Sequence, residues 1–319
     1  MSEIAVIGAG AWGTALAVQA ARAGRAVVLW ARDAGRAGAI EASRVNPRLP
    51  GVVLPGSIRV TSVLPGAGMT LLVVPLQHMR AVVAGLPGGG PVVVCAKGVE
   101  RGSLLLPLEV LAAVRGDREG AVLTGPNFAH EVAAGLPAAA VVAGGEALRA
   151  AVMAGIGTPG FRLYGNDDAI GAQVGGAAKN VVAIAAGAVV GAGLGENARA
   201  ALVTRGLAEM ARLAVALGGR AETVAGLSGL GDLLLTCTGA SSRNFSLGLE
   251  LGRGLGLAEV LAGRSAVTEG VTTAPALAAR AAAAGVGMPI VEAVAAVMRG
   301  EIDVQGAIAA LLGRPLRDE

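Results

Sequence analysis

The pattern of hydrophobic and polar positions changes near residue 165 of this 319-residue chain. Before that point, short β-type apolar runs alternate with helical stretches, and the runs cover residues 4–7, 26–30, 70–74, 92–94, 121–123 and 138–142. This alternation is typical of a parallel sheet covered by helices. After about residue 167, long segments rich in Ala, Leu and Val, such as 202–217 and 274–284, predict helices.

These two patterns predict an α/β protein with two domains. The chain is longer than one typical domain of roughly 100 to 200 residues. We place a parallel-sheet domain at residues 1–178 and an all-helical domain at residues 179–319. The composition is 54% hydrophobic but only 2% aromatic, with 51 glycines, so we expect helices that pack closely through small side chains.

A glycine-rich segment, GAGAWG, begins at Gly8 directly after the first predicted strand and leads into a helical stretch. In such a segment Gly8 permits a tight turn, Gly10 lets the backbone approach a pyrophosphate, and Gly13 lets helix and strand pack closely. Free N–H groups at the start of the helical stretch, near Thr14, would face the phosphates, and Ala11 in the loop is a further candidate cofactor contact. A flexible glycine turn is the alternative, but the position after an N-terminal strand favours a Rossmann-type, dinucleotide-binding domain.

The second predicted strand leads to Arg32 and Asp33. A protein that uses only NAD usually places an acidic side chain there, which binds the adenosine ribose. Arg32 can instead face a 2′-phosphate, although Asp33 follows it directly. We therefore expect NADPH to be accepted at least as well as NADH.

Only two lysines, Lys97 and Lys179, occur among the 26 Lys and Arg residues, so the other 24 are arginines. Arg stays protonated at ordinary pH, whereas Lys can lose its proton when burial or nearby cations lower its pKa. A proton-transfer step needs a group of the second kind. Chance, or a slot too narrow for a guanidinium, is the alternative for either lysine taken alone.

The surroundings of the two lysines favour a functional role. Lys97 follows the predicted strand 92–94, so we expect it at the carboxyl end of the sheet, where open α/β folds bind ligands. Lys179 and Asn180 follow the sequence GGAA, whose small residues would let a cofactor or substrate approach their helix.

Two further clusters lie in the helical region. The segment LSGLGD, which ends at Asp232, predicts a glycine-rich turn that opens a helix, and Asp232 and Thr236 would share one face of that helix. Asp232 could also cap the helix, a role that can coexist with substrate contact. The segment SSRN, which ends at Asn244, supplies hydrogen-bond donors suited to phosphate, although a single arginine is more often a solvated surface charge.

Composition and charge argue against several other classes of protein. The formal net charge is +3 and the basic residues are scattered, which does not favour nucleic acid as a partner. Cys95 and Cys237 lie in apolar segments without a Cys/His cluster, so we predict two buried thiols and no metal site. We find neither a run of roughly 20 apolar residues nor a signal-peptide pattern. We therefore expect no membrane span and a cytoplasmic protein.

Taken together, the motifs resemble those of the bacterial NAD(P)-dependent glycerol-3-phosphate dehydrogenases over nearly the whole chain. In order, they are GAGAWGTALA from Gly8, VVPLQHMR from Val73, CAKGVE from Cys95, GPNFAHEV from Gly125, AAKNVVAIAAG from Ala177, LSGLGDLLLTC from Leu227, SSRN from Ser241 and VTEGVTTA from Val267. The first is shared by many dehydrogenases, whereas AKG, GPNFA, AAKN, GLGDL with TC, and SRN in this order are specific to this family. Leu76 departs from the small polar residue expected at its position, without affecting a proposed chemical role.

The resemblance implies a role for each matching residue. Lys179 would be the catalytic acid/base, Asp232 would orient the substrate beside it, and Lys97 would contact both cofactor and substrate. Asn180 and Thr236 would fix the lysine and the substrate hydroxyls by hydrogen bonds. The remaining implied substrate contacts are Gly125, Asn127, Ser242, Arg243 and Asn244, and the remaining implied cofactor contacts are Trp12, Ala129, Arg243, Val267 and Glu269. For Trp12, packing behind the loop is the alternative.

The implied reaction is a reversible hydride transfer between NADPH or NADH and dihydroxyacetone phosphate, a small phosphorylated substrate. It gives sn-glycerol 3-phosphate, a precursor for glycerophospholipids. Lys179 would donate the proton to the carbonyl oxygen, while Lys97 and Arg243 hold the anionic ends. The resemblance also implies a homodimer and a helical domain like the C-terminal domain of 6-phosphogluconate dehydrogenase, and it gives no role to His78 or His130.

Two alternatives stay open. Dehydrogenases for 3-hydroxyisobutyrate or 6-phosphogluconate share the two-domain plan and a helix-borne lysine and asparagine, but they would not predict SSRN as a phosphate site. A regulatory protein that senses NAD(P) without turnover would need the nucleotide loop but neither Lys179 nor Asp232.

Overall fold

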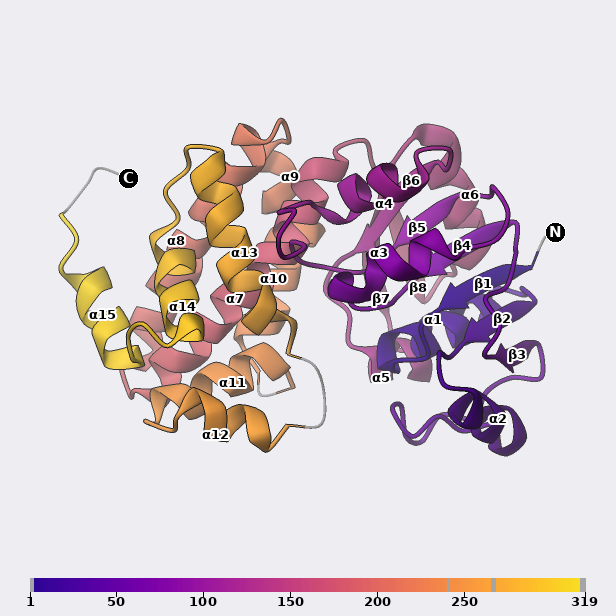
Figure 1. Cartoon of the computed structure of the whole chain (residues 1–319), viewed down its shortest axis with the longest axis horizontal. Helices are drawn as coiled ribbons and strands as arrows, with labels where there is room; N and C mark the ends of the chain where they lie inside the picture. The colour runs from indigo at the N-terminus through magenta and orange to yellow at the C-terminus, as the bar shows by residue number, and fades with distance from the viewer. Residues whose placement is uncertain (1–2, 240, 265–267, 316–319) are drawn as a thin grey trace. The chain divides into compact units, whose positions relative to one another are not determined.

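The computed structural model describes residues 3–239, 241–264 and 268–315, and the chain divides into two compact units. Unit 1 comprises Met1–Lys97 and Leu106–Ala172, and unit 2 comprises Gly98–Leu105 and Gln173–Glu319 (Figure 1). The expected division at residue 178 stays a prediction, and its position falls inside one continuous helix, α7 (Ala169–Gly191).

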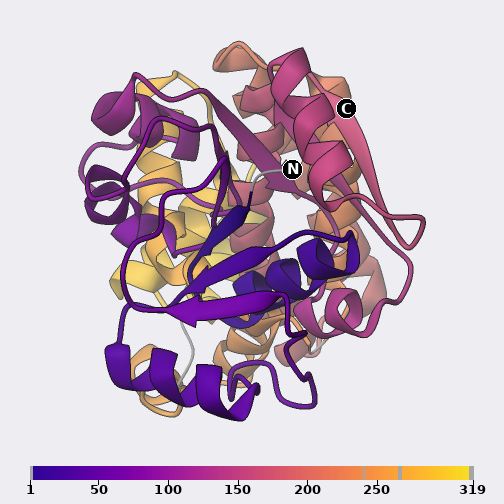
Figure 2. The ribbon, with the colours of Figure 1, turned by 90° about the vertical axis from the view of Figure 1, so that its right-hand side faces the viewer.

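Unit 1 is built on an eight-stranded sheet of order β3-β2-β1-β4-β5-β6-β7-β8. Figure 2 shows strands of unit 1 as arrows, with helices packed around them. The strands are β1 (Ile4–Ile7), β2 (Val27–Trp30), β3 (Ile58–Thr61), β4 (Met69–Leu72), β5 (Val92–Val94), β6 (Gly120–Thr124), β7 (Ala138–Gly144) and β8 (Phe161–Asn166). The first six in this order are parallel, so their carboxyl ends meet at one edge. The chain order reverses between β1 and β4, which is where open α/β sheets bind ligands.

The sheet differs from the sequence prediction at its edges. β7 pairs with β6 in the antiparallel direction, and β8 runs parallel to β7. The connection from β6 to β7 contains only a six-residue helix, α5 (Ala129–Ala134), and it returns the chain beside β6 in the opposite sense. The predicted runs omitted the edge strands β3 and β8, because exposed side chains interrupt the apolar residues of both.

Helices complete unit 1. Besides α5 they are α1 (Ala11–Arg22), α2 (Ala34–Ser43), α3 (Leu76–Ala84), α4 (Pro107–Arg115) and α6 (Glu146–Ile156). Every residue of β1, β2, β4 and β5 is buried, as expected where helices cover a parallel sheet. This explains why these four strands read as apolar runs in the sequence, interrupted only by Thr70 of β4.

Unit 2 is helical, and no strand follows β8 in the described residues. After most of α7 it contains α8 (Gly195–Ala216), α9 (Ala221–Ala225), the π-helical turn η1 (Leu227–Gly231), α10 (Asp232–Cys237), α11 (Arg243–Gly252), α12 (Leu257–Ala262), α13 (Glu269–Ala283), α14 (Pro289–Arg299) and α15 (Val304–Leu312). The predicted succession of a Rossmann-type sheet domain and an all-helical domain is confirmed.

Glycines bring α7 and α11 into backbone contact. A Cβ at Gly187 would lie 2.0 Å from the carbonyl oxygen of Phe245, and a Cβ at Gly248 would lie 1.9 Å from that of Ile184. Neither contact could form with a larger residue, so the helices pack closely through small residues as expected. α7 is long and apolar enough to cross a membrane by length and composition, but 78% of its most apolar 18-residue window is buried inside the protein. It is therefore the core helix of unit 2.

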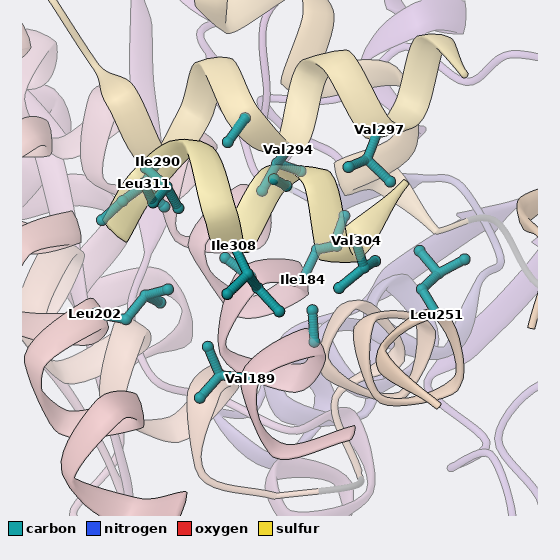
Figure 3. A pocket seen from close by; sticks show the side chains of 14 residues that line it. Ile184, Val189, Leu202, Leu251, Ile290, Val294, Val297, Val304, Ile308 and Leu311 are labelled. Atoms are coloured by element: carbon teal, nitrogen blue, oxygen red, sulfur yellow. The ribbon is translucent and has the colours of Figure 1, made fainter. Parts of the chain in front are cut away.

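An apolar cavity of about 60 Å³ lies beneath α15 (Figure 3). Its wall includes Ile184 of α7, Leu202 of α8, Leu251 of α11, Val294 of α14 and Ile308 of α15. Only Ala307 is buried in α15. The terminal helix is thus held by a thin apolar contact.

The two cysteines are free and buried, as predicted. Cys95 follows β5 in unit 1, and Cys237 ends α10 in unit 2. Burial raises the pKa of each thiol to about 12, so both stay protonated and unreactive at neutral pH.

Candidate active site

The loop after β1 has no room for side chains at two of its three glycines. Gly8 has φ +124°, and a Cβ there would lie 2.9 Å from the carbonyl oxygen of Val73, which follows β4. A Cβ at Gly13 would lie 1.9 Å from the carbonyl oxygen of Gly8. Gly10 differs, since nothing lies within 4 Å of where its Cβ would be. This open face is the one that a pyrophosphate would need.

The start of α1 is suited to an anion. Its N-cap is Gly10, which offers no capping side chain, and its first turn holds no acidic residue. The loop is fixed by the buried Asn46, whose amide donates to the carbonyl oxygen of Ala9 (3.1 Å) and to Thr14 Oγ1 (2.6 Å). Arg36 also donates to the carbonyl oxygen of Ala9. An uncapped helix N-terminus on a rigid loop fits the pyrophosphate of a dinucleotide.

A small apolar cluster brings three predicted cofactor residues together. Ala11, Trp12 and Ala129 pack, partly buried, against Ala15, Leu49 and Ala133. Trp12 also contacts the main core of unit 1. The ring of Trp12 therefore has a packing role whether or not it contacts the dinucleotide.

The carboxyl end of β2 is basic. Asp33 is the N-cap of α2, where its carboxylate accepts a hydrogen bond from the backbone N–H of Arg36 (2.7 Å). Arg32 is exposed beside it. Burial, and then the positive charge of Arg48, lowers the pKa of Arg36. The one acidic side chain in this segment therefore has a structural role, and the surrounding charge is positive.

Further predicted residues lie at the carboxyl ends of β5 and β6. Lys97 follows β5 and is partly buried. Gly125 follows β6 with φ +144°, and a Cβ there would lie 3.0 Å from the backbone of β7. Asn127 Nδ2 donates to the carbonyl oxygen of Ala139 (2.9 Å), whereas Asn127 Oδ1 is buried without a hydrogen-bond partner. The sheet thus places these residues at the same edge as the loop after β1.

In unit 2, Lys179 forms an ion pair with Asp232. Lys179 Nζ donates to Asp232 Oδ1 (2.6 Å) and to Thr236 Oγ1 (2.9 Å). The side chain of Asp232 is 1% exposed and that of Lys179 is 12% exposed, so their attraction is only weakly screened by water. The Thr236 hydroxyl donates to the backbone carbonyl of Asp232 (2.6 Å), so its oxygen is left to accept from the lysine. Two acceptors therefore fix the position of the amine.

The turn before α10 places Asp232. It forms the π-helical segment η1, and such segments are frequent at functional sites. A Cβ at Gly175 of α7 would lie 2.7 Å from the carbonyl oxygen of Ser228 in η1. Lys179 lies four residues after Gly175 in α7, and Asp232, the first residue of α10, lies four residues after Ser228. The close approach at Gly175 thus sets up the ion pair one turn later.

The segment SSRN begins α11. Ser242 is its N-cap, and its Oγ accepts a hydrogen bond from the backbone N–H of Phe245. The first turn of α11 holds no acidic residue. Asn244 Nδ2 donates to Asn180 Oδ1 (2.9 Å), and Asn244 Oδ1 accepts from the backbone N–H of Gly270 (3.0 Å). The side chain of Asn244 is therefore already bonded within the protein.

Unit 1 brings together the predicted residues of the nucleotide loop and of the strand ends, and unit 2 brings together those of α7, α10, α11 and the start of α13. Glu269 opens α13 and accepts a hydrogen bond from Asn180 Nδ2 (3.4 Å). Val267 lies outside the described residues. His78 and His130 are both exposed. No group of three or more His, Cys, Asp or Glu side chains that could hold a metal occurs among the described residues.

Sequence reasoning missed Asn46, Arg36 and Gly270. Asn46 is a fully buried amide in the loop after α2, and no local pattern marks it. Gly175, the first residue of GGAA, was expected to let a cofactor or substrate approach the helix, but the backbone of Ser228 lies in that space.

Comparisons with known proteins cover most of the chain. Residues 3–149 match the family model described as "NAD-dependent glycerol-3-phosphate dehydrogenase N-terminus", and residues 168–309 match the corresponding C-terminus. A "Glycerol-3-phosphate dehydrogenase [NAD(P)+]" of Acidiphilium cryptum is 57% identical over 99% of this chain and 98% of its own length. One from a Bradyrhizobium species is 53% identical over 99% and 98%, respectively. The crystal structure of glycerol-3-phosphate dehydrogenase from Coxiella burnetii superposes with a TM-score of 0.93 at 38% identity, covering 98% of this chain and 99% of that one.

Proposed function

Because the chain belongs to the family of NAD-dependent glycerol-3-phosphate dehydrogenases, we propose that it interconverts dihydroxyacetone phosphate and sn-glycerol 3-phosphate. Either NADH or NADPH serves as its cofactor, and the product is a precursor for glycerophospholipids. The observation that carries this proposal is the buried contact of Lys179 with Asp232 and Thr236, because it provides a positioned proton donor.

Unit 1 holds the cofactor in this proposal. Gly8, Gly10, Ala11 and Gly13 form the turn that receives the pyrophosphate. Arg32 faces the ribose end, and Trp12 and Ala129 are further cofactor contacts. A bound nicotinamide ring supplies or accepts the hydride. Lys97, Gly125 and Asn127 contact the substrate, and Lys97 also contacts the cofactor.

Lys179 moves the proton. In the reductive direction, Nζ donates a proton to the substrate oxygen as negative charge develops on it. Asp232 and Thr236 hold Nζ in place, since each accepts one of its hydrogen bonds. In the oxidative direction the neutral amine accepts the hydroxyl proton. An arginine could not do so, because its guanidinium stays protonated.

The start of α11 binds the substrate phosphate in this proposal. Arg243 supplies a charge-assisted donor. The first turn of the helix, which holds no acidic residue, adds backbone N–H groups. Ser242 caps the helix and keeps those N–H groups in order. Asn244 is a further substrate contact: its bonds to Asn180 and Gly270 hold its side chain in place, and its NH₂ group keeps a second N–H for the phosphate.

We also propose that the protein works in the cytoplasm as a homodimer. Two free, buried thiols suit a reducing compartment. The outer face of α15, where Leu312 is 80% exposed, is an apolar surface that a second copy would cover. Sedimentation at several protein concentrations tests the dimer, and a monomer at all of them would contradict it.

The decisive experiment compares the wild type with Lys179→Ala in NADPH oxidation that depends on dihydroxyacetone phosphate. The variant is expected to bind NADPH, observed by nicotinamide fluorescence, but to lose turnover by roughly two to four orders of magnitude. Lys179→Arg is the matched variant, because it keeps the positive charge and should be comparably inactive. A wild type that binds NADPH but oxidises it with no short carbonyl compound would instead indicate a cofactor sensor.

A further inference from the structure

A closed set of hydrogen bonds connects α7, α11 and α13 in unit 2. The backbone N–H of Gly270 donates to Asn244 Oδ1 (3.0 Å), Asn244 Nδ2 donates to Asn180 Oδ1 (2.9 Å), and Asn180 Nδ2 donates to Glu269 Oε2 (3.4 Å). Glu269 and Gly270 are neighbours in the chain, so the peptide unit between them closes the ring. We refer to these four residues as the amide ring.

The direction of every hydrogen bond in the amide ring follows from two groups of fixed character, the backbone N–H of Gly270 and the carboxylate of Glu269. A backbone N–H can only donate, so the atom of Asn244 that faces Gly270 must be the oxygen. The NH₂ group of Asn244 then donates to Asn180, so the acceptor on Asn180 must be its side-chain oxygen. The NH₂ group of Asn180 is thereby directed to the carboxylate of Glu269, which can only accept when ionised. One backbone donor thus orients two side-chain amides.

The amide ring has little room to rearrange. Asn180 is 4% exposed and Asn244 is 8% exposed. A Cβ at Gly270 would lie 2.6 Å from Asn244 Oδ1 and 2.9 Å from the backbone oxygen of Asn180. The start of α13 therefore packs directly against the side-chain amide of Asn244 and the backbone of Asn180.

The amide ring also joins two residues that the proposed function needs. Asn180 directly follows Lys179 on α7, and Asn244 directly follows Arg243 on α11. A fixed link between Asn180 and Asn244 therefore ties the helix that carries the proton donor to the helix that carries the phosphate-binding arginine.

We propose that Asn244 and Glu269 are positioning residues, which act together to present the Asn180 amide to the substrate in one fixed orientation. This inference rests on the proposed function. It adds a second role to the substrate contact expected for Asn244, because its side chain also decides which atom of Asn180 is available.

The proposal can be tested by reversing the direction of the hydrogen bond between Asn244 and Asn180. Asn244→Asp keeps an acceptor for Gly270 but places an acceptor opposite Asn180 Oδ1. Asn180 can then donate only by turning its amide over, which would set its oxygen against the Glu269 carboxylate. We expect the midpoint of thermal unfolding to fall by roughly 3–8 °C and kcat/KM to fall by roughly tenfold or more.

Adding Glu269→Gln should restore stability, because glutamine can donate to the reversed Asn180 oxygen. The matched control is Asn244→Asp with Glu269→Ala, which removes the same negative charge but supplies no donor. We expect the Gln double variant to regain most of the lost unfolding temperature and the Ala double variant to regain clearly less. Turnover should stay low in both, because Asn180 is still reversed.

Two outcomes would overturn the proposal. Equal stability of the Gln and Ala double variants would mean that charge rather than bond direction matters. Recovery of both stability and kcat/KM in the Gln double variant would mean that the amide ring only supports the fold. The unfolding measurements need no substrate, so they separate this inference from the proposed function, which the wild-type assay tests by itself.

Discussion

Gly175 lies so close to Ser228 that a methyl group on its Cα would stand 2.7 Å from the Ser228 carbonyl oxygen. The contact joins α7 to the π-helical turn η1 one turn before Lys179 meets Asp232. We therefore expect the separation of the two elements at Gly175 to set the distance between Lys179 and Asp232.

Gly175→Ala should weaken the ion pair without removing either partner. The added methyl group must push η1 away from α7, which we expect to cost about 1–3 kcal/mol of unfolding free energy and to lower kcat more than it raises KM. Urea unfolding and steady-state kinetics measure both effects. Gly38→Ala in α2 is the control, because nothing lies within 4 Å of a Cβ there. If Gly175→Ala behaves like Gly38→Ala, the contact does not position Asp232.

Arg32→Ala should change the choice of cofactor. Asp33 already caps α2, so loss of Arg32 removes a positive charge proposed to meet the 2′-phosphate. A charge-assisted hydrogen bond of about 1.5–3 kcal/mol corresponds to a rise in KM of roughly ten- to hundredfold for NADPH, with little change for NADH. Arg59→Ala, an exposed arginine on β3, controls for general charge. An equal rise for both cofactors would contradict the assignment of Arg32.

Glu209 should make the stability of unit 2 depend on pH. Burial raises the pKa of this α8 carboxyl to about 7, against the opposing effect of hydrogen bonds from the backbone N–H groups of Ile290 and Val291. The Glu209 carboxyl therefore binds its proton more tightly in the folded protein than in the unfolded chain, where its pKa has the ordinary value of 4.5. Protonated Glu209 therefore contributes its full share of the unfolding free energy below about pH 4.5, and this contribution is lost as the pH rises through about 7.

Glu209→Gln resembles the protonated side chain and cannot ionise. We expect its unfolding temperature, relative to the wild type, to rise between pH 5 and pH 8, by an amount equivalent to about 1–3 kcal/mol. Calorimetry at several pH values measures this difference. Parallel curves for the two proteins would show that Glu209 does not titrate in this range.

Filling the cavity beneath α15 should stabilise unit 2. Ala307 lines it, and Ala307→Val adds two methyl groups to an apolar space of about 60 Å³ (Figure 3). We expect a gain of about 0.5–1 kcal/mol in urea unfolding. Ala201→Val, at an exposed position of α8 in the same unit, controls for the lower helix propensity of valine. A gain no larger than that of the control would mean that the cavity resists filling.

The sequence predicts most of the fold because the central strands of unit 1 are buried throughout. Strands such as β1 and β5 consist of apolar residues alone, which a linear scan detects. The edge strand β8 escapes such a scan, since its exposed positions interrupt the apolar run. The antiparallel direction of β7 is also hidden, because direction depends on how the connection packs and not on the strand's own residues.

The candidate site shows the same contrast. Lys179 stands out because lysine is rare in this chain, and Asp232 and Thr236 follow from their spacing on one helix. The bond between Asn180 and Asn244 joins residues 64 apart in sequence, and no local pattern indicates it. Gly270 is likewise unremarkable among 51 glycines until its backbone N–H is seen to orient an amide.

The two buried thiols give each unit its own internal reporter. Cys95 lies in unit 1 and Cys237 in unit 2, and an alkylating reagent can reach either only after the surrounding structure opens. The labelling rate of each cysteine in the native protein therefore measures the local opening of one unit separately from the other. Mass spectrometry of two peptides from a single sample would then show which half of the protein opens first, without any added probe.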